Sequence, residues 1–205
     1  MRTLSLRLAI LLTVFVAAGL GEVALAAHQV VSAVWGLTAF ALDALAIAAQ
    51  ALVGHALGAS NVGRARAVLR RTVTWGLGAG VLLGAVVAVS GWWLATLFTT
   101  DPEVRAAVTV VLVVVGACLP MAGWVFVLDG VLIGAGDGRY LAGAGMLTLA
   151  VYAPVALAVR AWAPGGAAGL AWLWVAFAGV FMCARAITTS RRANGQTWLH
   201  TGSAH

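Results

Sequence analysis

The sequence predicts an all-α membrane protein, a single bundle of six transmembrane helices, from its composition and from the length of its apolar stretches. Of its 205 residues, 63% are hydrophobic and only 9% are charged, and the mean hydropathy is +1.03. A water-soluble core of this length cannot bury so much apolar surface, so lipid must surround the chain. Segments that cross hydrocarbon satisfy their backbone hydrogen bonds internally, which makes the spans helical.

Six apolar stretches have about the 20 residues that a helix needs to cross a bilayer. They cover residues 8–27, 30–53, 72–98, 106–128, 141–159 and 167–187. The whole chain, residues 1–205, is therefore expected to form one six-span membrane lobe.

The arginines are sorted between the gaps that separate these spans. Ten of the twelve lie in the even-numbered gaps, counting the amino terminus as zero and counting Arg185, near the end of the last span, with the gap that follows it. Only Arg105 and Arg160 lie in the odd ones. Short cytoplasmic loops retain Lys and Arg, so we expect a multi-pass protein of the cytoplasmic (plasma) membrane with both termini in the cytoplasm. The net charge of +6 then faces anionic lipid, which argues against a nucleic-acid partner. The ten arginines are Arg2, Arg7, Arg64, Arg66, Arg70, Arg71, Arg139, Arg185, Arg191 and Arg192.

The first stretch has a second interpretation. A basic start, an apolar run and the small residues at 24–27 also fit a cleavable signal peptide. Glu22 interrupts the run, however, and cleavage would remove the even number of spans. A retained first span is therefore favoured.

The connection after the second span predicts a short helix on the membrane surface over residues 61–71. Asn61 is a capping residue, and Val62, Ala65 and Leu69 fall on one helical face. The arginines of this segment would contact lipid phosphates and anchor the neighbouring spans, at about 1 kcal/mol each near an anionic leaflet. They are Arg64, Arg66, Arg70 and Arg71.

Turn-forming residues mark two further connections. Asp101 is expected to cap the fourth span, with Pro102 at its first helical position. The glycine-rich segment 129–139 lacks the preceding strand and the following Lys of a phosphate-binding loop. It is interpreted as a sharp cytoplasmic turn with the charge pattern of Asp137 and Arg139.

Small residues and prolines shape the spans themselves. Gly76, Gly80 and Gly84 recur every four residues, so one face of the third span lets a neighbouring backbone approach closely. Pro120 and Pro154 lie within the fourth and fifth spans and are expected to bend them.

Three carboxylates at membrane depth are the strongest candidates for functional residues. An ionised carboxylate is costly against lipid, so each is expected to face the bundle interior or water. Asp43 lies near the middle of the second span, Glu22 near the far end of the first, and Asp129 closes the fourth at the cytoplasmic side. These three residues are the candidates for binding a proton or a cation.

Asp43 is the strongest of the three, because its low-dielectric position favours uptake of a proton. Gln50 follows seven residues later, close to the same helical face. The alternative is that Asp43 is a permanently protonated or hydrogen-bonded packing residue. Glu22 lies close enough to the interface for its carboxylate to reach water.

No metal site, cofactor or enzyme activity is expected. His28 and Gln29 lie at a span boundary, and one His with Glu22 is too small a ligand set for a metal. Cys118 and Cys183 lack the spacing of a disulfide framework or a metal site. Too few polar residues converge to assemble a nucleophile, a base and an oxyanion site.

Motifs in the second span and around the end of the fourth are similar to those of a known family. Residues 26–59 contain Ala-Ala-His-Gln-Val at 26–30, Leu-Asp-Ala-Leu-Ala at 42–46, Gln-Ala-Leu-Val-Gly at 50–54 and Leu-Gly-Ala at 57–59. In order and spacing these motifs resemble the multidrug and toxic compound extrusion (MATE) transporters. Phe-Val-Leu-Asp-Gly at 126–130, followed by Gly-Ala-Gly-Asp at 134–137, resembles the DinF-like branch. The resemblance covers almost the whole chain, but only the second half of such a transporter.

The resemblance implies about twelve spans in two six-helix lobes around a central cavity. It also implies export of cationic or amphipathic compounds by antiport against protons or sodium. This chain would supply the carboxy-terminal lobe and would need a second six-span lobe, either a separate chain or a second copy. The DinF-like proton site is an aspartate of the other lobe, and Glu22 resembles an acidic position of the NorM-like branch, so the coupling ion stays open between H+ and Na+.

The cavity is expected between the first, second and fourth spans. Its carboxylates and its apolar or aromatic walls would hold bulky amphipathic cations. Candidate lining residues are Gln50, Trp35, Trp124 and Gln29. The alternative function is a non-transporting membrane interaction module that packs through its Gly/Ala faces, or a truncated relic that requires a partner lobe.

Overall fold

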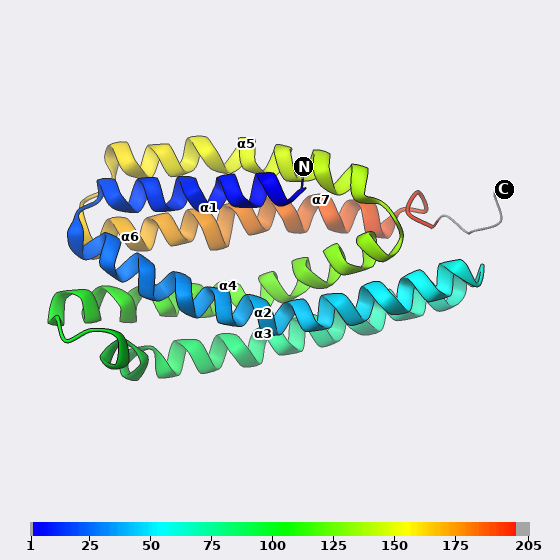
Figure 1. The fold of residues 1–205 in the computed structure, drawn as a ribbon, viewed down its shortest axis with the longest axis horizontal. Coiled ribbons are helices and arrows are strands. Elements are labelled where there is room, and N and C mark those ends of the chain that lie inside the picture. The colour runs from blue at the N-terminus through cyan, green and yellow to red at the C-terminus, as the bar shows by residue number, and fades with distance from the viewer. Residues whose placement is uncertain (1, 200–205) are drawn as a thin grey trace.

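The computed structural model describes residues 2–199, and every regular element in this range is helical (Figure 1). The predicted all-α class is confirmed. The elements are α1 (Arg2–Gly19), α2 (Glu22–Gly58), α3 (Val62–Phe98), α4 (Pro102–Gly134), α5 (Gly138–Trp162), α6 (Gly166–Trp174), the π-helix η1 (Val175–Phe181) and α7 (Met182–Asn194).

Among the described residues, five helical segments are long and apolar enough to cross a membrane. Four of them are α2, α3, α4 and α5, and the fifth, Gly166–Asn194, joins α6, η1 and α7. The apolar part of α1, Ser5–Gly19, is shorter. Five of the six predicted spans thus correspond to helices of membrane-spanning length, and α1 is shorter than the span predicted there.

The connections gather at two opposite ends of the bundle (Figure 1). One end holds the α2–α3 turn, the α4–α5 turn and the end of α7, and the other holds the α1–α2, α3–α4 and α5–α6 connections. The first end carries the arginines at 64–71, Arg139 and the pair at 191–192, whereas the second carries Arg105 and Arg160. The arginine asymmetry of the sequence is thus an asymmetry of the folded molecule.

The first helix ends earlier than predicted. α1 stops at Gly19 and α2 starts at Glu22, so the span expected over 8–27 is wrong at its second end. The chain turns at Gly21, whose φ of 111° is a conformation that glycine adopts without steric cost. The turn itself contains no polar residue, and Glu22, the polar residue that follows it, starts α2 instead of lying inside the first span. His28 consequently lies inside α2, buried, instead of at a span boundary.

The segment 61–71 is helical, but it is not a separate surface helix. Asn61 caps it as predicted, because the Asn61 side chain accepts a hydrogen bond from the Arg64 backbone N–H at 2.9 Å. The helix then continues without a break to Phe98, since no proline or turn residue separates the arginines from the apolar stretch. The four arginines lie exposed on the opening turns of α3.

Asp101 starts α4 as predicted. Its Oδ1 accepts hydrogen bonds from the backbone N–H groups of Glu103 at 2.8 Å and Val104 at 3.3 Å. Pro102 occupies the first turn, where its missing N–H costs nothing. The sequence signal for this helix start is therefore confirmed.

The turn predicted over 129–139 is shorter than expected. α4 continues to Gly134, so Asp129 lies inside this helix and does not close a span. The apolar residues after Asp129 extend the helix because nothing in them interrupts its hydrogen bonds. Asp137 forms its ion pair with Arg192 of α7, so the charge pattern with Arg139 is not a contact.

The glycine face of α3 packs against α4 within the same chain. A Cβ on Gly80 would lie 2.5 Å from the Leu119 carbonyl oxygen and 2.7 Å from the Pro120 Cα. A Cβ on Gly76 would lie 2.7 Å from the Gly123 carbonyl oxygen. The predicted close approach of backbones is confirmed, and this face is already used inside the chain instead of being free for a partner. Pro120 and Pro154 both lie inside continuous helices.

Candidate functional site

A cavity of about 480 Å³ lies between α1, α2, α4, η1 and α7. Its walls combine two carboxylates, one guanidinium and several aromatic rings. The lining residues are Leu6, Ile10, Trp35, Gly36, Ala39, Phe40, Asp43, Ala46, Ile47, Gln50, Phe126, Asp129, Gly130, Ile133, Phe177, Met182 and Arg185.

α2 supplies one wall of the cavity. Trp35, Asp43 and Gln50 lie on the same face of this helix because they are separated by about two helical turns each. The small residues Gly36 and Ala39 leave room beside them. Asp43 is half-buried in this wall.

α4 supplies the facing carboxylate. A Cβ on Gly130 would lie 2.8 Å from the Ala46 Cα, and a Cβ on Gly134 would lie 2.9 Å from the Gln50 Cα. The backbones of α2 and α4 are therefore in contact at Gly130 and at Gly134, in the helical turn of α4 that follows Asp129. This contact fixes Asp129 in the cavity wall, where it is 6% exposed.

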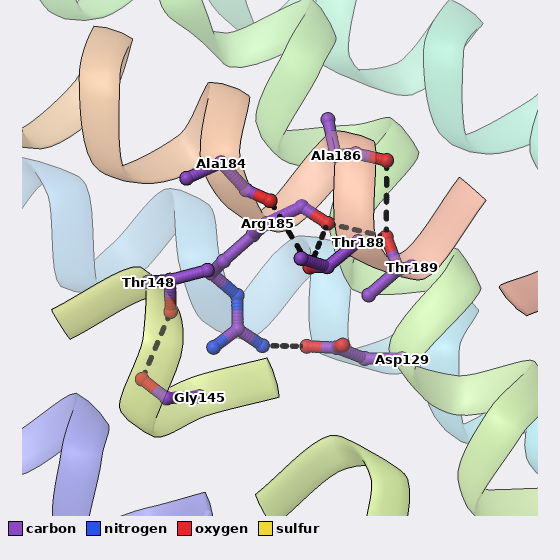
Figure 2. A network of polar contacts seen from close by, with 8 residues as sticks. All are labelled: Asp129, Gly145, Thr148, Ala184, Arg185, Ala186, Thr188 and Thr189. Carbon is purple, nitrogen blue, oxygen red and sulfur yellow. Dashed lines mark hydrogen bonds and ion pairs between the residues drawn. The ribbon is translucent and has the colours of Figure 1, made fainter. Parts of the chain in front are cut away.

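Asp129 forms a buried ion pair with Arg185 of α7, shown in Figure 2. Arg185 Nη2 donates to Asp129 Oδ2, and the two side chains are 6% and 8% exposed respectively. The other carboxylate oxygen, Oδ1, is buried and has no hydrogen-bond partner. The hydroxyls of Thr188 and Thr189 beside the pair donate to backbone carbonyls of their own helix.

Aromatic rings form the side of the cavity next to η1. Trp35 packs against Trp174 with ring centroids 6.0 Å apart and against Phe177 at 5.6 Å. Phe177 stacks on Phe181 at 5.6 Å. The π-helical register of η1 widens one turn of the helix, a feature found often at functional sites. Aromatic faces of this kind attract cations.

The structure brings four of the predicted site residues to this cavity and leaves the others outside. Asp43, Asp129, Gln50 and Trp35 all line it. Their spacing along two helices therefore indicates a common site, while their roles stay predictions.

Glu22, Gln29 and Trp124 do not line the cavity. Glu22 is the exposed first residue of α2, and Gln29 is exposed two turns before the cavity begins. Trp124 lies on another face of α4, where its indole N–H donates to Ser190 Oγ at 3.1 Å. The expectation that Gln29 and Trp124 line the cavity is wrong, because Gln29 precedes it on α2 and because α4 presents several apolar faces. The exposed position of Glu22 fits a carboxylate that reaches water, and its ion-binding role stays a prediction.

Arg185 is a site residue that the sequence alone assigns only to the arginine-rich end. It falls inside the apolar stretch 167–187, and an ionisable residue at membrane depth is a functional candidate by default. An ionisable residue inside an apolar stretch is therefore the sequence signal that identifies Arg185 as a site residue. Phe126, Phe177 and Met182 carried no comparable signal, because apolar residues fill every span.

Comparison with known proteins gives the chain its relatives. The MatE family model matches residues 3–158. The chain is 30% identical over 204 residues to DETOXIFICATION 45, chloroplastic, of Arabidopsis thaliana, which covers 98% of this chain and 35% of that protein. It is 36% identical over 137 residues to DETOXIFICATION 44, chloroplastic, of the same plant, covering 66% of this chain and 26% of that protein.

A vertebrate relative is similar over a shorter stretch. The chain is 36% identical over 129 residues to multidrug and toxin extrusion protein 1 of Xenopus tropicalis, covering 61% of this chain and 22% of that protein. The chain thus spans about a third or less of the length of these relatives. No solved structure matches it. Together with the helical spans, the family match over most of the chain makes it a multi-pass membrane protein of the MatE family, whose members are transporters and not enzymes.

Proposed function

We propose that this chain is the carboxy-terminal lobe of a DinF-like antiporter that expels cationic or amphipathic compounds in exchange for protons or sodium. The observation that carries the proposal is the cavity in which Asp43 and Asp129 lie among aromatic and apolar side chains. Such a lining suits a bulky cation, because carboxylates supply the charge and aromatic faces supply adaptable contacts. The motif that resembles the DinF-like branch includes Asp129, and Asp43 lies in a motif that resembles MATE transporters in general.

Exchange follows from competition for the same carboxylates. A carboxylate that holds a proton or a sodium ion has no charge left for an organic cation, so the two occupants exclude each other. Binding of the coupling ion from one side of the membrane would then release cargo on that side. The half-buried position of Asp43 lets both occupants reach it from the cavity.

A second six-span lobe would complete the cavity. Phe40 and Ile47 line it, yet they are 75% and 64% exposed, so one side of the cavity is open. Lobes of transporters are related by repeats that meet at the substrate site. The partner is either a separate chain or a second copy of this one. The arginine-rich end would face the cytoplasm, which puts both termini there.

Dye efflux from bacteria that lack their own exporters tests the proposal. The chain is expressed alone, with a second copy fused in tandem, and behind the first lobe of a DinF-like relative. Asp43→Asn is expected to abolish efflux of a cationic dye in the form that transports. Asp101→Asn is the matched control, because Asn retains the capping role of this exposed residue far from the cavity.

Efflux that persists at the wild-type rate in Asp43→Asn would remove Asp43 from the mechanism. Absence of efflux in all three forms, with the protein present in the membrane, would contradict the transport function.

A further inference from the structure

The cavity wall contains a cation of its own. Arg185 and Asp129 both line the cavity, and their ion pair joins α7 to α4. The guanidinium therefore occupies the carboxylate that an incoming cation would use. We propose that Arg185 is an internal competitor: cargo binds Asp129 only by displacing Arg185, and this displacement loosens α7 from α4. The inference rests on the proposed function, because it takes this cavity as the cargo site.

The charge of Asp129 is balanced by one donor. An ionised carboxylate accepts hydrogen bonds on both oxygens. Within the described residues, however, Arg185 is the only donor to Asp129, and Oδ1 is buried without a partner. On the side of α5 the neighbours of the pair are the uncharged residues Leu141, Ala144 and Gly145. Exchange of one cation for another at Oδ2 therefore leaves no other charged contact to rearrange.

The charged groups that face the pair across the cavity favour a second cation over an anion. Asp43 of α2 lines the same cavity, and Gln50 beside it is neutral. The residues contributed by α1 and η1 are Leu6, Ile10 and Phe177, which carry no charge. Among the described residues, the charged groups of the lining are thus two carboxylates and one guanidinium.

Displacement of Arg185 would free only one of two ion pairs that hold α7. In the second pair, Arg192 donates to Asp137 at 2.5 Å and 3.1 Å and lies over the Tyr140 ring, 4.8 Å from its centroid. Arg185 and Arg192 are about two helical turns apart on α7, whereas Asp129 lies in α4 and Asp137 lies in the turn between α4 and α5. Asp137 is not among the cavity residues, so cargo reaches the inner pair alone. The outer pair then acts as the pivot about which α7 moves.

The two native cysteines report on this movement. Cys118 lies on α4 one turn before Met121, and Cys183 of α7 places its Sγ 3.3 Å from the Met121 Sδ. A short thiol-reactive cross-linker that joins Cys118 to Cys183 therefore measures whether α4 and α7 stay together. Mass spectrometry of the digested chain gives the cross-linking yield.

The experiment combines this yield with equilibrium binding of tetraphenylphosphonium to the purified chain in lipid nanodiscs. Arg185→Gln is expected to tighten binding about fivefold or more, the scale of coupling between two ligands that exclude each other. Arg185→Lys is expected to tighten it less, because an ammonium group still competes. Arg192→Gln, the matched change in the outer pair, leaves the affinity unchanged. Tetraphenylphosphonium lowers the cross-linking yield of the wild type.

Misfolding does not depend on the charge at position 185, so a larger gain in Arg185→Gln than in Arg185→Lys identifies the competition. Unchanged or weaker binding in both Arg185→Gln and Arg185→Lys overturns the proposal, and so does a wild-type yield that tetraphenylphosphonium does not change. If efflux requires Asp43 but replacing Arg185 does not change the affinity for tetraphenylphosphonium, the proposal that Arg185 competes with cargo is wrong. The transport function then stands. If replacing Arg185 tightens tetraphenylphosphonium binding but no form of the chain exports the dye, the transport function is wrong. The competition between Arg185 and the bound cation then stands.

Discussion

The two halves of α4 both pack through glycines, the first on α3 and the second on α2, but the second half also carries one member of a buried ion pair. The first half packs backbone against backbone on the glycine face of α3, through Gly116 and Gly123. The second half lines the cavity and carries Asp129, whose charge is balanced by a direct ion pair with Arg185 of α7. One continuous helix thus serves as a rigid attachment at one end and as the wall of a charged site at the other. The same helix therefore holds the fold through small residues along much of its length, and one added ion pair in its second half connects it to the site.

The largest effect on stability is expected in the second half. Asp129→Ala leaves the Arg185 guanidinium buried without a counter-charge, so the free energy of unfolding should fall by about 3 kcal/mol or more. Asp137→Ala removes the equivalent carboxylate of the outer pair, where the Arg192 side chain is 24% exposed to solvent, and about 1 kcal/mol is expected. Unfolding in mixed micelles, followed by tryptophan fluorescence, measures both. Equal losses for the two variants would contradict the distinction between a buried and a solvated pair.

A smaller effect is expected in the first half. Gly80→Ala places a methyl group within 2.5 Å of the Leu119 carbonyl oxygen, so α3 and α4 must separate, at a cost of about 2 kcal/mol. Gly78→Ala is the control, since a Cβ there meets nothing within 4 Å, and the better helix propensity of Ala should stabilise α3 slightly. The same unfolding assay compares them. Similar effects of both changes would mean that the glycine face is not a tight contact.

The aromatic wall is expected to give the smallest effect, on binding instead of stability. Trp35→Ala removes one ring face from the cavity and should weaken binding of a quaternary cation by about 1 kcal/mol. Trp92→Ala, an exposed tryptophan near the far end of α3, should leave binding unchanged. Equilibrium dialysis with tetraphenylphosphonium measures the difference. A wild-type affinity in Trp35→Ala would limit the site to its charged groups.

Much of the fold and part of the site could be predicted because they depend on short-range spacing. The four-residue period of Gly76, Gly80 and Gly84 indicates a packing face, and the seven-residue interval between Asp43 and Gln50 indicates a shared one. These sequence patterns predict the folded arrangement because a helix repeats its geometry along the whole span.

The remaining features depend on contacts between distant segments. Arg185 and Asp129 are 56 residues apart, so only the packed bundle makes them a pair. The turn at Gly21 is followed directly by Glu22, but a single Glu does not distinguish a turn from an ionisable residue within a span. The direction of Trp124 was not predictable either, because most faces of α4 are buried and apolar, and no polar side identifies its outward face.

The most direct test of the central claim is photoaffinity labelling of the chain in lipid nanodiscs with an azido-substituted aromatic cation, followed by mapping of the labelled peptides. Label is expected within residues 35–50 of α2 and 126–133 of α4, and an excess of tetraphenylphosphonium should protect both. Label confined to the exposed face of α3, or label that the competing cation does not reduce, would contradict the claim that this cavity binds cations.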